Sequence, residues 1–149
     1  MAIRAAGVMN MLKDIAQKEV DTATEALAEA MKIADEAKSK YDLLVEYRND
    51  YSKSLQQSLE MGIGALAYQN FQGFFRKLDQ AVKGQFEMLV SAQHHVLVQK
   101  KRWKESQRKK LSYDVLEQRD VEKQTKVANK KEQLMMDEFA MRATRHAKQ

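Results

Sequence analysis

An apolar residue recurs at alternating intervals of three and four along the first part of the chain. A 3.5-residue repeat sustained this long is typical of a helix that supercoils against a partner helix. The 149 residues include no proline, so nothing in the composition forbids very long helices. The repeat therefore predicts an all-α coiled coil. Its positions are Ala16, Val20, Ala23, Leu27, Ala30, Ala34, Ala37, Tyr41, Leu44, Arg48, Tyr51 and Leu55, of which only Arg48 is charged.

The stretch SLEMGIGALAYQNFQGFF, residues 58–75, interrupts this repeat. It contains three of the five glycines, and Gly62 and Gly64 directly follow the last regular position, where glycine commonly ends a helix. Short connections between helices make antiparallel neighbours. We therefore predict helices at about residues 10–60 and 71–145, joined by a turn at about 61–70. Together they form a single elongated coiled-coil domain, residues 1–149.

A similar apolar stripe continues after the turn, with polar interruptions at Gln93 and Lys100. If the second helix folds back from residue 70, it reaches the start of the first helix near residue 120. Later residues then have no partner within the chain. The predicted fold is an antiparallel two-helix coiled-coil hairpin with an overhanging C-terminal helix. The stripe consists of Phe71, Phe75, Leu78, Val82, Phe86, Leu89, Val96 and Trp103.

The chain lacks the motifs on which catalytic and metal sites are built. It has no cysteine, no glycine-rich phosphate loop and no nucleophile elbow. His94 and His95 are adjacent and point to different helix faces, which does not suit joint ligation of a metal. We expect no enzyme, no catalytic residue, no cofactor and no metal. The N-terminus is a poor signal peptide and no segment is apolar enough to span a membrane, so we expect a cytoplasmic protein.

Residues 97–131 carry the basic charge of the chain, with twelve basic against five acidic side chains. Within them, KKRWKESQRKK at 100–110 indicates a solvated face, an acidic protein partner, or nucleic acid. Trp103 alone is not a platform for stacking bases. A basic coiled coil that binds nucleic acid is the alternative function, and a homo-oligomeric structural coiled coil is a third hypothesis.

Aromatic residues near the turn exceed what a two-helix seam can cover, because such a seam hides mainly two positions per heptad. Tyr47 and Phe74 are the surplus. Either they form a docking patch, or the helices splay near the turn and bury them. In the predicted overhang, Met135 and Phe139 form an apolar stripe flanked by Arg142, which either frays or binds a groove on another protein.

Four segments in order along the chain resemble the flagellar export protein family FliJ. They are LKDIAQKEVD at 12–21, LLVEYRNDY at 43–51, YQNFQGFFRKLDQAV at 68–82 and MDEFAMRA at 136–143. The resemblance covers nearly the whole chain. The aromatic spacing around the turn and the terminal DEF tripeptide are its most specific parts.

The resemblance implies a cytoplasmic component of the bacterial flagellar type III export apparatus, associated with the inner membrane only through partners. FliJ-like proteins form a hairpin similar to the central stalk of rotary ATPases. They promote assembly and activity of the flagellum-specific ATPase ring, contact the export gate membrane protein, and interact with export chaperones. Nucleic acid and direct membrane insertion are not expected.

The resemblance also implies which residues contact the export gate and which contact the ATPase. Gln85 stands where the family has a polar or basic residue in the gate contact. The ATPase contact falls on the early first helix and on the tail, at Met135, Phe139 and Arg142. The implied gate-binding residues are Leu44, Tyr47, Tyr51, Phe74, Leu78 and Ala81.

Overall fold

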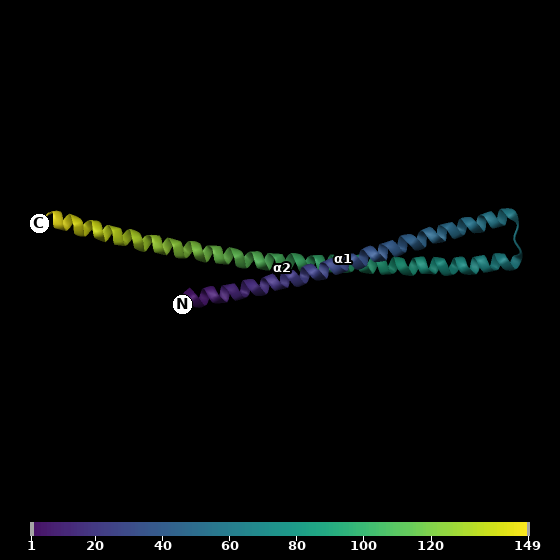
Figure 1. Cartoon of the computed structure of the whole chain (residues 1–149), viewed down its shortest axis with the longest axis horizontal. Helices are drawn as coiled ribbons and strands as arrows, with labels where there is room; N and C mark the ends of the chain where they lie inside the picture. The colour runs from purple at the N-terminus through teal and green to yellow at the C-terminus, as the bar shows by residue number, and fades with distance from the viewer. Residues whose placement is uncertain (1, 149) are drawn as a thin grey trace. The chain divides into compact units, whose positions relative to one another are not determined.

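The computed structural model consists of two long helices joined by a three-residue turn (Figure 1). It describes the backbone of residues 2–148 and the side chains of residues 6–148. Helix α1 spans Ala2–Met61 and helix α2 spans Ala65–Ala147. The described residues contain no strand. The predicted all-α helical hairpin is confirmed.

The turn is shorter than the predicted 61–70. Gly62 has a φ of 85°, the left-handed conformation that glycine adopts without a steric penalty, and its N–H donates to the Leu59 carbonyl at 3.3 Å. The Gly64 carbonyl already accepts from the N–H of Tyr68 at 3.1 Å. Residues 65–69 are mostly good helix formers, so α2 begins before residue 70 and Asn70 lies inside the helix. Helix α1 likewise begins earlier than residue 10.

The helices divide into two compact units. The turn unit is Asp21–Glu105, and the terminal unit is Met1–Val20 with Ser106–Gln149. Residues 1 and 149 of the predicted domain lie outside the described residues.

Side-chain contacts across the turn unit run antiparallel. Near the turn, Arg48 Nη1 contacts Asp79 Oδ1 at 3.2 Å. At the far end of the unit, Trp103 Nε1 donates to Thr24 Oγ1 at 3.1 Å. As numbers fall along α1 they rise along α2, which is the pairing of a hairpin.

The terminal unit is paired in the same antiparallel sense by charged residues. Lys109 Nζ lies 3.3 Å from the Glu19 carboxylate, and Lys13 Nζ lies 2.5 Å from Glu117 Oε2. Past this pairing, every described residue from 121 to 148 is exposed. Within this unit α2 therefore extends beyond the start of α1, as the predicted overhang requires (Figure 1).

The apolar core is a single seam between the helices. All twelve predicted seam positions of α1 are buried or half-buried. Alanines contribute much of the α1 side, so the helices meet through small side chains on α1 and larger ones on α2. The buried apolar residues are Ala16, Val20, Ala30, Ala37, Leu78, Val82 and Leu89.

One part of the predicted α2 seam was wrong. Gln85 and Gln99 occupy the seam, whereas Phe86, Gln93 and Lys100 are exposed. A strict seven-residue spacing from Leu78 passes through 85, 92 and 99, and the helix keeps this register although a larger apolar side chain stands one residue later. Gln85 is tolerated because its Nε2 donates to the Ala37 carbonyl at 3.1 Å.

Candidate functional site

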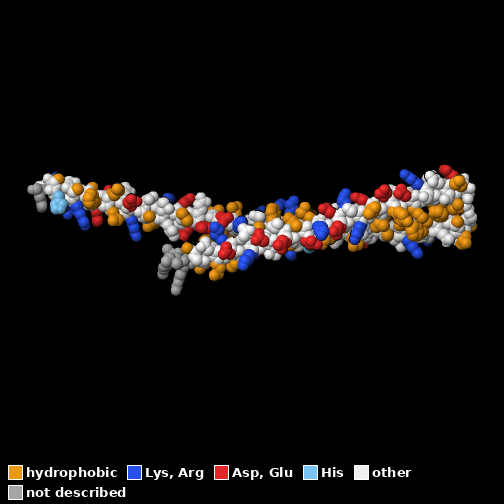
Figure 2. Space-filling view, viewed as in Figure 1, with side chains coloured by type: hydrophobic (Ala, Val, Ile, Leu, Met, Phe, Trp, Pro, Cys, Tyr) orange, Lys and Arg blue, Asp and Glu red, His pale blue; other side chains and the backbone are white. Residues whose placement is uncertain are grey.

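One side of the turn unit carries the surplus aromatics. Phe74 and Ala81 are seven residues apart on α2, which places them on one line along a supercoiled helix. On α1, Tyr47 lies one turn before Tyr51, whose ring centroid is 4.8 Å from that of Phe74. We call the side bearing Tyr47, Phe74 and Ala81 the Tyr47 face. Figure 2 shows hydrophobic side chains gathered at the turn end of this unit.

The aromatic side chains near the turn differ in how much of their surface is exposed. The Tyr51 ring packs between Phe74 and Phe71, the latter at 5.2 Å, and is half-buried. Tyr47 nevertheless keeps 53% of its surface exposed and Phe74 keeps 40%. Aromatic contacts across the seam therefore fix the position of Phe74 while leaving much of its ring accessible.

The six residues implied for gate binding differ in how deeply they are buried. Leu78 is buried in the seam with 7% exposure, and Leu44 and Tyr51 are half-buried. Ala81 is exposed. All six lie in the turn unit, where Tyr47, Phe74 and Ala81 are exposed and the other three are buried or half-buried.

Two further exposed residues, Met88 and Leu43, adjoin this set and were not predicted from the sequence. Met88 follows Ala81 by seven residues and is 63% exposed, so it extends the same line on α2. Leu43 is exposed on α1, one turn before Tyr47. The seven-residue spacing of 74, 81 and 88 was the signal that could have found Met88.

The opposite side of the turn unit holds a groove between the helices, about 350 Å³ in volume. Asp35 and Lys38 border it. No described residue of the Tyr47 face lines it, which separates the two sides of the hairpin. Its lining is Met31, Ala34, Asp35, Lys38, Gln93, Val96 and Leu97.

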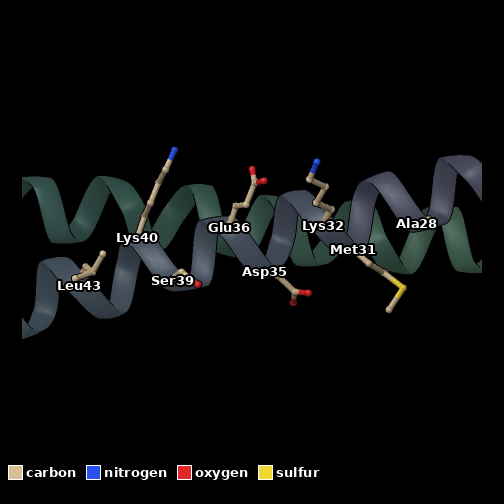
Figure 3. Close-up of a pocket in the computed structure, with 8 residues that line it drawn as sticks. All are labelled: Ala28, Met31, Lys32, Asp35, Glu36, Ser39, Lys40 and Leu43. Atoms are coloured by element: carbon tan, nitrogen blue, oxygen red, sulfur yellow. The ribbon is translucent and has the colours of Figure 1, made fainter.

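A second, larger hollow of about 680 Å³ is formed by α1 alone (Figure 3). Lys32, Glu36 and Lys40 point to one side of it, while Met31 and Asp35 point to the other. The side chains diverge over the outer surface of a single helix, so this hollow is not an enclosed binding cavity.

In the terminal unit, the residues implied for ATPase binding are all exposed on the overhang. Met135 is 71% exposed and Phe139 is 76% exposed, and Arg142 is exposed one turn further on. The structure also shows a second set of exposed apolar side chains at seven-residue spacing, namely Val127, Leu134 and Met141. Since 134 and 135 are adjacent, the two sets lie on different faces of the helix.

The basic segment offers no stacking surface for bases. Trp103 is half-buried and its indole N–H donates to Thr24 across the seam. The surrounding lysines and arginines from 100 to 105 are exposed. This arrangement agrees with a solvated basic face and gives the nucleic-acid alternative no specific support.

Among the described residues, Asp79 and Lys13 have shifted pKa values. The hydrogen bond from Lys83, followed by that from Arg48, lowers the pKa of Asp79 despite some desolvation. The hydrogen bond to Glu117 raises the pKa of Lys13, with Asp114 adding to the effect. Both groups pair helices or helix turns at the surface, which is a structural role. Among the described residues no cluster of three His, Asp or Glu side chains is arranged to hold a metal ion.

These features define a helical-hairpin protein whose described residues carry exposed apolar side chains and no enclosed binding cavity. The family model for the flagellar FliJ protein matches residues 6–149, so the chain belongs to the FliJ family. It is 30% identical over 137 residues to the flagellar FliJ protein of Salmonella typhi, covering 92% of this chain and 93% of that relative. The flagellar FliJ protein of Escherichia coli strain K12 is 28% identical over the same length, with the same coverage.

Membership of the family makes this chain a component of flagellar protein export, and the family is not an established family of enzymes. In the part of the chain that the structure describes, neither helix has a stretch apolar enough to cross a membrane.

Proposed function

We propose that the chain is a non-enzymatic stalk of the flagellar export apparatus that couples the export ATPase ring to the export gate. The gate contact falls on the Tyr47 face of the turn unit, and the ATPase contact on the overhang at Met135, Phe139 and Arg142. Export chaperones are further partners. In this proposal the protein acts in the cytoplasm and reaches the inner membrane only through its partners.

The observation that carries the proposal is the overhang, in which residues 121–147 are helical and every described residue from 121 to 148 is exposed. Most of the stability of a helix in a protein comes from packing one face against other elements, and the described residues give the overhang no such packing. Its apolar side chains lie on two faces, one with Met135 and Phe139 and the other with Leu134 and Met141. A single shallow groove covers one face of a helix. The pore of a ring surrounds a helix, so it suits a tail that is apolar on two faces.

Exposed aromatics support the gate contact. Tyrosine and phenylalanine contribute strongly to protein interfaces when a rigid scaffold holds them. Phe74 is held by Tyr51, and Tyr47 stands on α1 within the same unit. The Tyr47 face therefore offers a preorganised surface.

The experiment is a steady-state ATP hydrolysis assay of the cognate flagellar export ATPase, titrated with the full chain and with a version that ends before Asn129. We expect the full chain to stimulate hydrolysis and the truncated chain not to. The turn unit serves as an internal control, because the truncation leaves residues 21–105 intact and their thermal unfolding should not change. Equal stimulation by both versions would contradict an ATPase contact on the overhang.

A further inference from the structure

The overhang continues the face of α2 that packs against α1. Ser106 and Tyr113 are half-buried in the terminal unit, where the two helices pair. The same seven-residue spacing leads on to Val127, Leu134 and Met141, which therefore lie on the same line of a supercoiled helix. These three side chains are 52%, 57% and 62% exposed. The seam of the hairpin thus has an apolar continuation on α2 that the described part of α1 leaves exposed.

The charged residues beside this line are arranged symmetrically about Leu134. Lys131 stands three residues before it and Asp137 three after it. Lys130 stands four residues before it and Glu138 four after it. Residues seven apart share one flank of the line, so Lys130 shares a flank with Asp137, and Lys131 shares the other with Glu138. None of the four takes part in an ion pair among the described residues.

This pattern is complementary to a copy of itself that runs antiparallel. A two-fold axis at Leu134 sets each flank against the same flank of the second copy. Lys131 then faces Glu138 of the second copy, and Lys130 faces Asp137, so four pairs of opposite charge form. A parallel pair in register would instead set the lysines against lysines and the carboxylates against carboxylates, which is unfavourable.

The other charged residues of the overhang do not oppose this arrangement. Glu122 and Glu132 lie on the far side of α2, away from the line. On the line and around it, each remaining charge meets an uncharged or oppositely charged residue. The facing positions are Asp120 with Lys148, Lys123 with Thr144, Gln124 with Arg145, Lys126 with Ala140, and Ala128 with Arg142.

We infer that two copies of this chain pair through their overhangs, antiparallel, along Val127, Leu134 and Met141. The second copy's overhang occupies the continuation of the seam and runs in the direction that α1 has in the hairpin. Three apolar side chains per copy make a small interface, so we expect weak pairing, with a dissociation constant of about 100 μM. The inference does not rest on the proposed ATPase contact, which includes Met135 and Phe139 off this line.

Sedimentation equilibrium of the full chain at low salt, from about 10 μM to about 1 mM, measures the dissociation constant. We expect a monomer–dimer equilibrium that weakens as salt is added. Leu134→Asp should raise the dissociation constant about tenfold or more, because it places a charge at the centre of the apolar line. Met136→Asp is the matched control, since Met136 is 67% exposed on the far side of α2, and it should stay within about twofold. A chain that remains monomeric, or equal effects of the two variants, would overturn the inference.

Exchange of charges tests the register. Lys131→Glu and Glu138→Lys should each raise the dissociation constant about threefold or more, because like charges then face each other on one flank. The two variants carry opposite charges at both positions, so their equimolar mixture should pair at least as tightly as the wild type. A mixture that pairs no more tightly than the separate variants would contradict this register and overturn the inference.

Disulfide cross-linking tests the direction of the pair. The chain has no cysteine, so a Val127→Cys chain and a Met141→Cys chain can be mixed and oxidised without interference. We expect cross-links between one chain of each kind, whereas links only between chains of the same kind would show a parallel pair and overturn the inference. A wild-type chain that stimulates the export ATPase but never pairs with itself would also overturn it, and would leave the proposed function standing.

Discussion

The turn unit and the terminal unit use the same two helices but are held together differently. In the turn unit the seam buries Leu78, Val82 and Leu89 and is flanked by packed aromatics. In the terminal unit the α2 side of the seam is polar, with Ser106 and Lys110 half-buried in it. Burial of apolar area is the main stabilising term in folding, so the turn unit contains most of the stability of the hairpin.

The two units therefore differ in how much apolar surface is buried between the helices and how much is exposed to solvent. The turn unit buries or half-buries many of its large apolar side chains in its own seam, although others, such as Met31, Leu66 and Met88, remain exposed. The overhang buries none, since Met135 and Phe139 contact no other helix of the described chain. Each prediction below tests that contrast, beginning with the largest expected effect.

Amide hydrogen exchange should separate the units most strongly. Amides of residues 78–96 should exchange only through global unfolding, whereas those of 121–148 should exchange roughly a thousandfold faster or more, because an unpaired helix opens locally. Exchange measured by mass spectrometry on the full chain checks this. Addition of the export ATPase should slow exchange in the overhang, and similar protection of both segments in the free chain would remove the contrast.

Leu78→Ala should lower the free energy of unfolding by about 3 kcal/mol, because the leucine is buried in the seam and the alanine leaves a cavity. Thermal and urea unfolding followed by circular dichroism measure the change. Met135→Ala on the overhang is the control and should leave the unfolding midpoint unaltered. An equal loss in both variants would mean that the overhang contributes to the fold.

Gln85→Leu should raise the free energy of unfolding by roughly 1 kcal/mol. The leucine gains apolar burial in the seam, and the Ala37 carbonyl that loses the glutamine donor lies inside α1. Urea unfolding of this variant beside Gln93→Leu, an exposed position, isolates the effect of the seam. A destabilised Gln85→Leu chain would show that the hydrogen bond outweighs the apolar gain.

Acid should weaken the turn unit slightly through Asp79. Its pKa is lowered in the folded chain, chiefly by the hydrogen bond from Lys83, so its contribution is present above the pKa of the unfolded chain. The contribution is lost as the pH falls below about 4 and through the lower folded pKa. Unfolding midpoints at pH 6 and pH 3 should therefore differ less in Asp79→Asn than in the wild type. An unchanged difference would assign the acid sensitivity to other carboxylates.

The long-range pattern of this chain predicted its architecture well. Twelve seam positions on α1, the reversal at Gly62 and the unpaired residues beyond 120 all followed from a repeat and a length. A heptad repeat imposes the same geometric constraint many times along the helix. One residue that departs from the pattern therefore does not change the predicted fold.

Single positions were predicted less well. Phe86 is apolar and belongs to the predicted stripe, yet register along the helix places Gln85 in the seam and gives it a hydrogen bond to Ala37. The predicted turn at 61–70 is longer than the observed one because residues 65–69 already form helix. In both cases a local preference competed with a helix that continues through it.

The candidate surfaces show the same division. The spacing of apolar residues was enough to select the aromatics near the turn and the stripe on the tail. Which of them face a partner was settled by the packing of α1 on α2, because the same heptad pattern is compatible with a buried Leu78 and an exposed Tyr47. Periodicity is a property of one helix, whereas exposure depends on where the second helix lies, and that is fixed only when the two helices share a seam.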